Sequence, residues 1–244
     1  MLDIYFLSGK ISSFEKKFID YEKMKRIIEC KTFEEFIVLL EGTFYKLPSG
    51  ISNSEEILKY FENEKDRLIE EIEKTFENDL RYFLLLKYDY FNFANLIEGK
   101  DKFSTYGTLN YYLLKDAFEK NDLLKIPEIL KDAFRISKVT KSTEEKLLLL
   151  KIDYYRKMYK ISEKFSDYLK NYVKIEIDFA NLETYLNKKL VNKKIEISDF
   201  IENGNIRKEF FLDEENLWKK VATEYKKVKT PLNEENIEFE KYKV

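Results

Sequence analysis

The sequence predicts an all-α protein, and three observations support that prediction. Charged residues make up 37% of the 244 residues, while there are only six glycines and three prolines, which favours long helices with solvated faces. Apolar residues recur at helical spacing between the glycine and proline breaks. In addition, an aspartate and an asparagine three positions apart in an apolar run, Asp89 and Asn92, return as Asp178 and Asn181. We therefore expect a chain assembled from similar helical units.

Capping residues mark several expected helix starts. Two pairs have the spacing of a capping box, in which a hydroxyl accepts from an orphan amide and an acid three positions later reaches back: Thr32 with Glu35, and Ser142 with Glu145. Ser54 and Thr108 are further N-cap candidates, and Thr108 directly follows Gly107.

The expected helices of the first half follow from these starts and from apolar periodicity. Residues 12–29 and 32–41 are predicted to form a helical hairpin, and residues 54–77 a long amphipathic helix rich in glutamate and lysine. Apolar residues of segment 79–98 cover almost its whole circumference, which predicts a helix buried on most sides. This helix should be central to its unit.

The second half repeats this order. Helices are expected at 142–160 and at 162–189, and the second of these again carries apolar residues on two sides. After each repeat-bearing helix comes a glycine that precedes a small polar and an apolar residue, beginning at Gly107 and at Gly204. The repeat therefore extends beyond the helix into the loop that follows it.

The repeated polar pairs have two interpretations. Residues three apart share one face of a helix, and polar groups on a buried face need partners that offset their desolvation. Each pair could form a small site for a ligand or an ion. Alternatively, each pair ties its helix to a neighbouring loop or helix end and fixes the register, and its occurrence in both units favours this structural role. The predicted structural signature consists of Asp89, Asn92, Gly107, Asp178, Asn181 and Gly204.

The residue types argue against most catalytic chemistry, so we predict no catalytic, metal or cofactor site. The chain has no histidine, which removes the commonest general base and metal ligand, and with one cysteine it cannot form a zinc pattern. There is no glycine-rich phosphate loop. Carboxylate pairs such as Glu70-Glu71 and Glu144-Glu145 are explained by solvated helix surfaces, although catalysis by carboxylates or lysine is still possible in principle.

Composition also limits the partners and the compartment. The formal net charge is −2 with both signs interleaved, so nothing indicates a nucleic-acid binder. Cys30 cannot form an intrachain disulfide, which predicts a reducing compartment. No apolar run approaches the length of a membrane span, so direct membrane insertion is not expected. Trp218 flanks an apolar helical stripe and is expected either at the rim of the core or as a contact residue of an interface.

These residues resemble a known family, the C-type subunits of the archaeal and bacterial A/V-type rotary ATPases, which are related to the d-type subunits of the eukaryotic V-ATPase. Segment 83–93 is similar to the family's Leu-Leu-Leu-Arg-x-Asp-x-x-Asn-Leu phrase, and Gly107-Thr108-Leu109 to its Pro-Gly-Thr-Leu turn. Segment 168–182 looks like the second copy of the phrase, and Thr43-Phe44-Tyr45 is similar to part of the first-unit hairpin. Residues 104–106 replace the proline before Gly107, and Asn203-Gly204 replaces a Gly-Gly pair.

The resemblance implies three helical units arranged as a funnel with pseudo-threefold symmetry. We expect a first unit at 1–120 with the N-terminal hairpin, a second at 121–216, and an incomplete third at 217–244. The third unit is essentially absent after about residue 230, which suggests a truncated chain or a shortened relative, and the tail from Thr230 is expected to be poorly anchored.

The resemblance also implies a function: a non-catalytic rotor adaptor that joins the central stalk to the membrane ring and transmits torque for proton or sodium transport. Its implied partners are the D-type and F-type proteins of the stalk and the membrane ring, and its implied location is cytoplasmic and peripheral to the membrane. A helical-repeat scaffold for protein partners, unrelated to rotary ATPases, would share the composition and the repeat. A helical enzyme that uses carboxylates would instead require a deep pocket with convergent acids.

Overall fold

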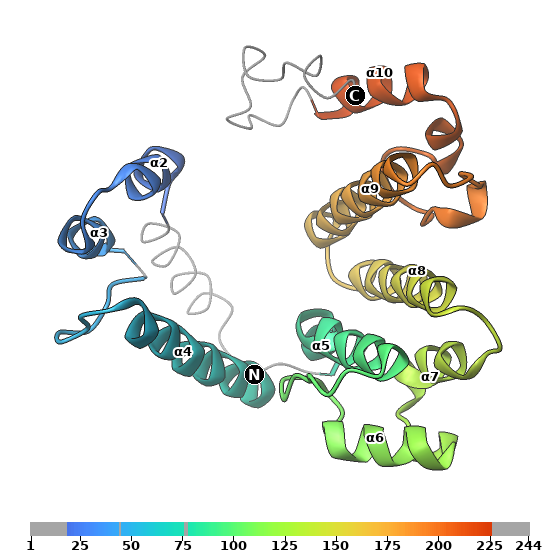
Figure 1. Cartoon of the computed structure of the whole chain (residues 1–244), viewed down its shortest axis with the longest axis horizontal. Coiled ribbons are helices and arrows are strands. Elements are labelled where there is room, and N and C mark those ends of the chain that lie inside the picture. Colours follow the sequence, from blue (N-terminus) through green and yellow to red (C-terminus); the bar gives the residue numbers. More distant parts are fainter. Residues whose placement is uncertain (1–18, 44, 76–77, 226–244) are drawn as a thin grey trace. The chain divides into compact units, whose positions relative to one another are not determined.

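The computed structural model describes residues 19–43, 45–75 and 78–225, and every regular element in these ranges is helical (Figure 1). The all-α prediction is therefore confirmed. The α-helices are α2 (Tyr21–Glu29), α3 (Phe33–Leu40), α4 (Ser54–Thr75), α5 (Asn78–Glu98), α6 (Tyr111–Lys120), α7 (Lys131–Lys138), α8 (Thr143–Ser162), α9 (Asp167–Leu190) and α10 (Glu214–Tyr225). Short 3-10 helices are η1 (Leu123–Lys125), η2 (Glu128–Leu130), η3 (Ile197–Asp199) and η4 (Lys208–Leu212).

Within the described residues, the chain divides into two compact units, one that ends at Glu71 and one that begins at Ile72. In the first unit, α2 and α3 pack together, and Lys23 Nζ donates a hydrogen bond of 3.3 Å to the carbonyl of Glu41 just after α3. The predicted hairpin is present in the described residues, but its first helix begins at Tyr21, because the Asp20 side chain caps it. The predicted residues 12–18 and the tail from Thr230 lie outside the described residues.

Of the predicted helix caps, the Ser142 capping box is confirmed in full, since Ser142 and Glu145 each accept from the other's backbone amide. Thr32 accepts from the amide of Glu35, but the Glu35 carboxylate binds the amide of Lys31 instead of closing the box. The Ser54 and Thr108 predictions are wrong. Asparagines cap these helices: Asn53 accepts from the Glu56 amide, and Asn110 from the amides of Tyr112 and Leu113.

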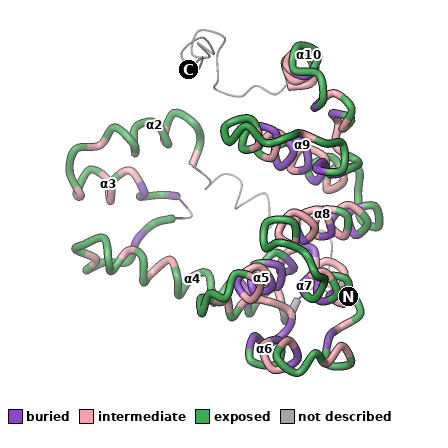
Figure 2. Tube along the Cα trace, turned by 45° about the vertical axis from the view of Figure 1, so that its right-hand side comes forward, coloured by how far each residue is buried: buried purple, intermediate pink, exposed green. Residues whose placement is uncertain are grey.

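The main core of the second unit lies among α5, α7, α8 and α9, with α6 against its edge. The fully buried residues of this core include Leu86 and Phe93 of α5 and Leu114 of α6. Figure 2 marks the buried residues of α5 and of the helices around it in purple. Thus α5 has the central position that its apolar circumference predicted.

A smaller core lies among the C-terminal part of α9, the loop after it, η4 and α10. It contains Tyr185, Phe200, Ile206, Phe211 and Leu217. The prediction that one helix runs from 162 to 189 is wrong at its start, because α8 continues through Ser162 and Ser166 caps α9. No helix in the described ranges is long and apolar enough to cross a membrane.

Candidate functional site

Asp89 lies on the buried side of α5 and binds the loop that precedes α6. Its Oδ2 accepts from the amide of Thr108 at 3.0 Å and from the Thr108 hydroxyl at 2.8 Å, and its Oδ1 accepts from the amide of Leu109 at 3.0 Å. The side chain is completely buried. Both carboxylate oxygens are therefore occupied by donors of the chain itself.

Asn92 lies one turn later on the same face of α5 and pairs with the backbone of a single residue. The amide of Ser104 donates to Asn92 Oδ1 at 2.7 Å, and Asn92 Nδ2 donates to the carbonyl of Ser104 at 2.9 Å. The asparagine side chain thus replaces a backbone partner for this turn of the loop, which would otherwise hold unpaired polar groups.

The second copy repeats this arrangement on α9. Asp178 accepts from the amides of Asn205 at 2.9 Å and Ile206 at 3.0 Å. Asn181 pairs with the backbone of Ile201, whose amide donates at 2.8 Å and whose carbonyl accepts at 2.9 Å. The four side chains that the sequence singled out are therefore all fully buried and all bound to the loop after their own helix.

In the second copy, the segment between the asparagine and its backbone partner is longer than in the first. This is the only difference in length between the bonded residues of the two copies. Asn92 and Ser104 are 12 residues apart in the sequence, whereas Asn181 and Ile201 are 20 apart. Asp89 and Thr108 are 19 residues apart, whereas Asp178 and Asn205 are 27 apart. Both separations are lengthened equally, so the longer segment, which contains η3, lies before Ile201. The turn that binds both polar side chains has the same length in the two copies.

A glycine allows the loop to approach each aspartate closely. A Cβ atom on Gly107 would lie 2.5 Å from Asp89 Oδ1, and one on Gly204 would lie closer still to Asp178 Oδ1. Both distances are far inside van der Waals contact. The glycines that the sequence grouped with the polar pairs are thus brought directly against them.

The third hydrogen bond to the aspartate differs between the copies. In the first copy it comes from the hydroxyl of Thr108. The second copy has Asn205 at that place in the turn, and the phenol of Tyr225 on α10 donates to Asp178 Oδ2 at 2.6 Å. The second copy is therefore tied to one more helix than the first.

Burial raises the pKa of Asp89 above its ordinary value, although the donors of Thr108 and Leu109 act in the opposite direction. Burial likewise raises the pKa of Asp178, opposed mainly by the Tyr225 phenol. Carboxyl groups with shifted pKa values can indicate a catalytic site. In Asp89 and Asp178, however, both carboxylate oxygens already accept hydrogen bonds from the chain itself. This geometry favours the structural interpretation of the pairs over a ligand site.

A second buried polar network joins α5 to α8 and was not singled out from the sequence. The phenol of Tyr90 donates to Asp153 Oδ2, and Lys157 Nζ lies 2.6 Å from the same oxygen and 3.1 Å from the phenol oxygen. Asp132 of α7 lies 3.6 Å from Lys157. The sequence signal that could have indicated this network is the spacing of Asp153 and Lys157, which are four residues apart in a leucine-rich segment and therefore share a helix face.

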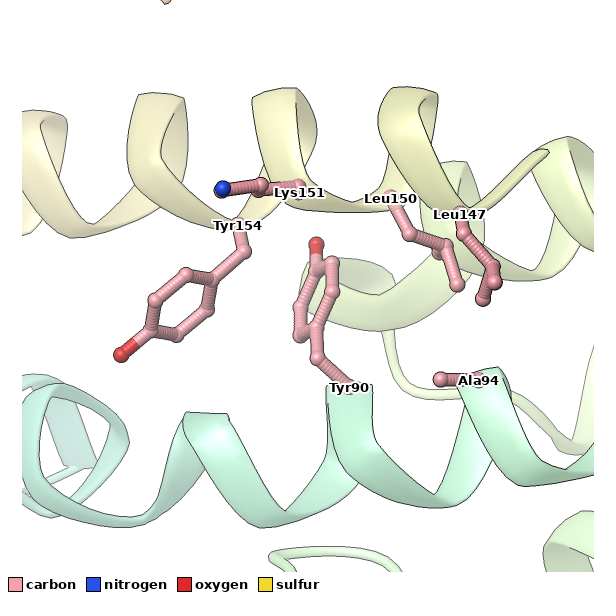
Figure 3. Close-up of a pocket in the computed structure, with 6 residues that line it drawn as sticks. All are labelled: Tyr90, Ala94, Leu147, Leu150, Lys151 and Tyr154. Carbon is pink, nitrogen blue, oxygen red and sulfur yellow. The ribbon is translucent and has the colours of Figure 1, made fainter. Parts of the chain in front are cut away.

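A pocket of about 180 Å³ lies beside this network between α5 and α8, and Figure 3 shows its lining. Tyr90 and Tyr154 extend into the space between the two helices from opposite sides. The remaining lining residues are Ala94, Leu147, Leu150 and Lys151, so no carboxylate lines this pocket. Lys151 Nζ is bound to the carbonyl of Ala180 at 3.1 Å and to Glu183 at 2.5 Å, both on α9.

Trp218 lies partly buried in the smaller core, with its ring edge-on to Tyr185 at a centroid distance of 6.4 Å. This partly buried position is compatible with both roles expected for Trp218, at the rim of a core and at an interface. Among the residues that the structure describes, no three acidic or cysteine side chains are grouped as metal ligands would be.

The model of one protein family, the ATP synthase (C/AC39) subunit, matches residues 7–243. No curated protein and no solved structure matches the chain.

Proposed function

Because this chain belongs to the family of ATP synthase (C/AC39) subunits, we propose that it is the non-catalytic adaptor in the rotor of a V/A-type ATPase. In this role it links the central stalk to the membrane ring and transmits torque between ATP turnover and ion transport. The observation that carries the proposal is the family match, which covers residues 7–243.

The buried polar pairs supply a property that the proposed role requires, namely resistance to twisting. A loop held only by apolar contacts can slide, because dispersion contacts have little directional preference. The paired hydrogen bonds of Asn92 and Asn181 and the multiple bonds of Asp89 and Asp178 fix both position and orientation. We propose that each Asp-Asn pair keeps its helix and the following loop in one register under load.

The network of Tyr90, Asp153 and Lys157 acts in the same way between helices. It joins α5 to α8 within the main core, where the low dielectric strengthens hydrogen bonds between buried groups. Packed interiors resist deformation, so torque applied to α5 is passed to α8 rather than absorbed. No step of this mechanism involves a chemical reaction.

The proposed partners are the D-type and F-type proteins of the central stalk and the membrane rotor ring, with attachment to the membrane through the complex on its cytoplasmic side. Within this proposal, Trp218 is a candidate contact residue, since it lies partly buried at the rim of the smaller core. We also propose that the chain is organised in helical units at 1–120, 121–216 and 217–244.

A three-component capture experiment tests this role. Tagged central-stalk proteins are immobilised, and detergent-solubilised ring is added with or without the full chain. We expect the ring to be retained only when the chain is present, because the chain is the link between them. Binding of the chain to neither component would refute the proposal, and binding to only one of them would refute the bridging role.

A further inference from the structure

Asn203 and Gly204 form the only Asn-Gly dipeptide in the sequence, and they lie between η3 and η4 in the loop after α9. In such a dipeptide the backbone nitrogen of the glycine can approach the side-chain carbonyl carbon of the asparagine, because the glycine has no side chain to hinder it. Asn203 is exposed to solvent. Water therefore has access to any product of that approach.

The fold explains why both residues of this dipeptide are present. The backbone of Asn203 has a φ of +72°, in the left-handed region that asparagine adopts more readily than most residues. Gly204 lies against the carboxylate of Asp178, where a side chain would collide with Oδ1. In the first copy the equivalent glycine, Gly107, follows Tyr106, which has no side-chain amide. Of the two copies, only the second carries the reactive dipeptide.

Two other asparagines with positive φ provide a comparison, Asn121 at +53° and Asn192 at +51°. The backbone amide after each of them donates to a carbonyl of the preceding helix, at 2.9 Å in both cases. Among the described residues, in contrast, the amide of Gly204 has no hydrogen-bond acceptor. Of the three asparagines, Asn203 is thus the one whose following nitrogen is not already occupied.

We propose that Asn203 is a site of spontaneous deamidation, with water as the only co-reactant. The nitrogen of Gly204 attacks Cγ of Asn203 and loses its proton to solvent, the bond between Cγ and Nδ2 breaks, and the amide group takes up a proton and leaves as ammonia. Water then adds to one of the two carbonyls of the resulting succinimide ring and opens it. The product is aspartate, or isoaspartate, in which the main chain runs through Cβ and Cγ. The proposal does not depend on the rotary function.

The reaction changes the loop between its two attachments to α9. On one side Ile201 is paired with Asn181, and on the other side the amides of Asn205 and Ile206 donate to Asp178. Isoaspartate lengthens the main chain between these attachments by a methylene group. Both products also add a negative charge one residue before the glycine that lies against Asp178, and like charges repel. Both changes therefore weaken the hydrogen bonds that hold the turn.

The effect extends to α10, because the Tyr225 phenol and the Asn205 amide donate to the same oxygen of Asp178. When the turn shifts, the carboxylate that it orients shifts with it, and the bond to Tyr225 is strained. Conversion of Asn203 therefore loosens both the turn and α10 as the protein ages. The turn of the first copy is unaffected.

Incubation of the full chain in mildly alkaline buffer tests the reaction. Samples taken over several weeks are digested with pepsin at acidic pH and analysed by mass spectrometry, with fragmentation that distinguishes isoaspartate from aspartate. We expect progressive loss of the unmodified peptide that contains Asn203, while the peptides that contain Asn121 and Asn192 stay unmodified. An intact Asn203 at the end of the incubation would overturn the proposal, and so would equal conversion at Asn121 or Asn192.

The variant Asn203→Gly is the matched control, because glycine keeps the positive φ and has no side-chain amide. Amide exchange of residues 214–225 should increase by about tenfold or more in the incubated wild type, as for loss of a hydrogen bond to a charged group, and should not change in the incubated variant. Unchanged exchange in fully converted wild-type protein would overturn the coupling to α10. An equal increase in both proteins would also overturn it, because the loosening would then come from another modification.

Discussion

The phenol of Tyr225 donates a hydrogen bond of 2.6 Å to the buried carboxylate of Asp178, and this bond fastens α10 to α9. The corresponding donor in the first copy, Thr108, lies within the turn itself. The repeat thus keeps the number of donors on the aspartate while it changes their origin. In the second copy, the polar tie serves two purposes, since it fixes the turn and anchors the last described helix.

Tyr225→Phe should therefore loosen α10 selectively. A hydrogen bond to a charged group contributes about 1.5–3 kcal/mol, and its loss should increase amide exchange in α10 by about tenfold or more. Exchange measured by mass spectrometry on residues 214–225 tests this expectation. Thr108→Val is the matched control, since it removes the equivalent donor and should increase exchange in 104–109 while α10 is unchanged. Unaltered exchange of α10 in Tyr225→Phe would show that its apolar contacts alone hold it.

Gly107→Ala and Gly204→Ala should both destabilise the protein, with the larger loss at Gly204. The added Cβ lies 2.5 Å from Asp89 Oδ1 in the first case and nearer to Asp178 Oδ1 in the second, so each carboxylate must move off its amide donors. We expect a loss of about 1–3 kcal/mol of unfolding free energy, measured by urea denaturation. Thr105→Ala, at an exposed position of the first loop, is the control and should change little. Equal stability of Gly107→Ala and Thr105→Ala would contradict the close approach.

Asn181→Ala should cost more than Asn92→Ala. Each substitution leaves one backbone amide and one carbonyl without the partner that they have in the native structure. Ile201 is buried, whereas Ser104 is only partly buried and can be reached by water, so the penalty of about 1–3 kcal/mol applies in full to the second copy. Thermal and urea denaturation of both variants provide the comparison. A larger loss for Asn92→Ala would mean that the burial of the turns does not control their stability.

The polar pairs could be predicted from the sequence because local features reveal them. Asp89 and Asn92 interrupt an apolar run at a spacing that shares a helix face, and the repetition at Asp178 and Asn181 shows that the interruption is not incidental. The glycine after each helix was visible for the same reason. The helix positions followed from periodicity, and errors arose at the ends, where Asn53 and Asn110 rather than the neighbouring Ser54 and Thr108 provide the caps.

Contacts between distant segments could not be predicted in this way. Tyr225 and Asp178 are 47 residues apart, and Tyr90 and Asp153 are 63 residues apart. Nothing in the sequence around either tyrosine specifies which buried carboxylate it will bind, because many tyrosines occupy helical apolar stripes in this chain. Such pairings are determined by how the helices pack against one another.

The stability of the protein should depend on pH through Asp89. Burial raises the pKa of this carboxyl in the folded state above its ordinary value of 3.8, so the folded state binds more protons than the unfolded state between the two pKa values. The contribution of Asp89 to the unfolding free energy is therefore fully present below the unfolded pKa and is lost as pH rises through the folded pKa. Urea denaturation across this range should show a fall with rising pH that Asp89→Asn lessens. An identical pH dependence of the variant would contradict the assignment to Asp89.

The network of Tyr90, Asp153 and Lys157 should behave as a coupled unit. Asp153→Leu removes the acceptor of both donors and leaves the Lys157 ammonium, whose side chain is only 14% exposed, without its nearest counter-charge. We expect a loss of about 3–5 kcal/mol of unfolding free energy for this variant. The double variant with Lys157→Leu removes both charges, and because an apolar pair can replace a buried ion pair at little cost, it should be more stable than Asp153→Leu alone. Urea denaturation of the wild type, both single variants and the double variant gives the coupling free energy directly. If the effects of the two single substitutions simply add, Asp153 and Lys157 do not stabilise each other, and the proposed stiff link between α5 and α8 must come from apolar packing alone.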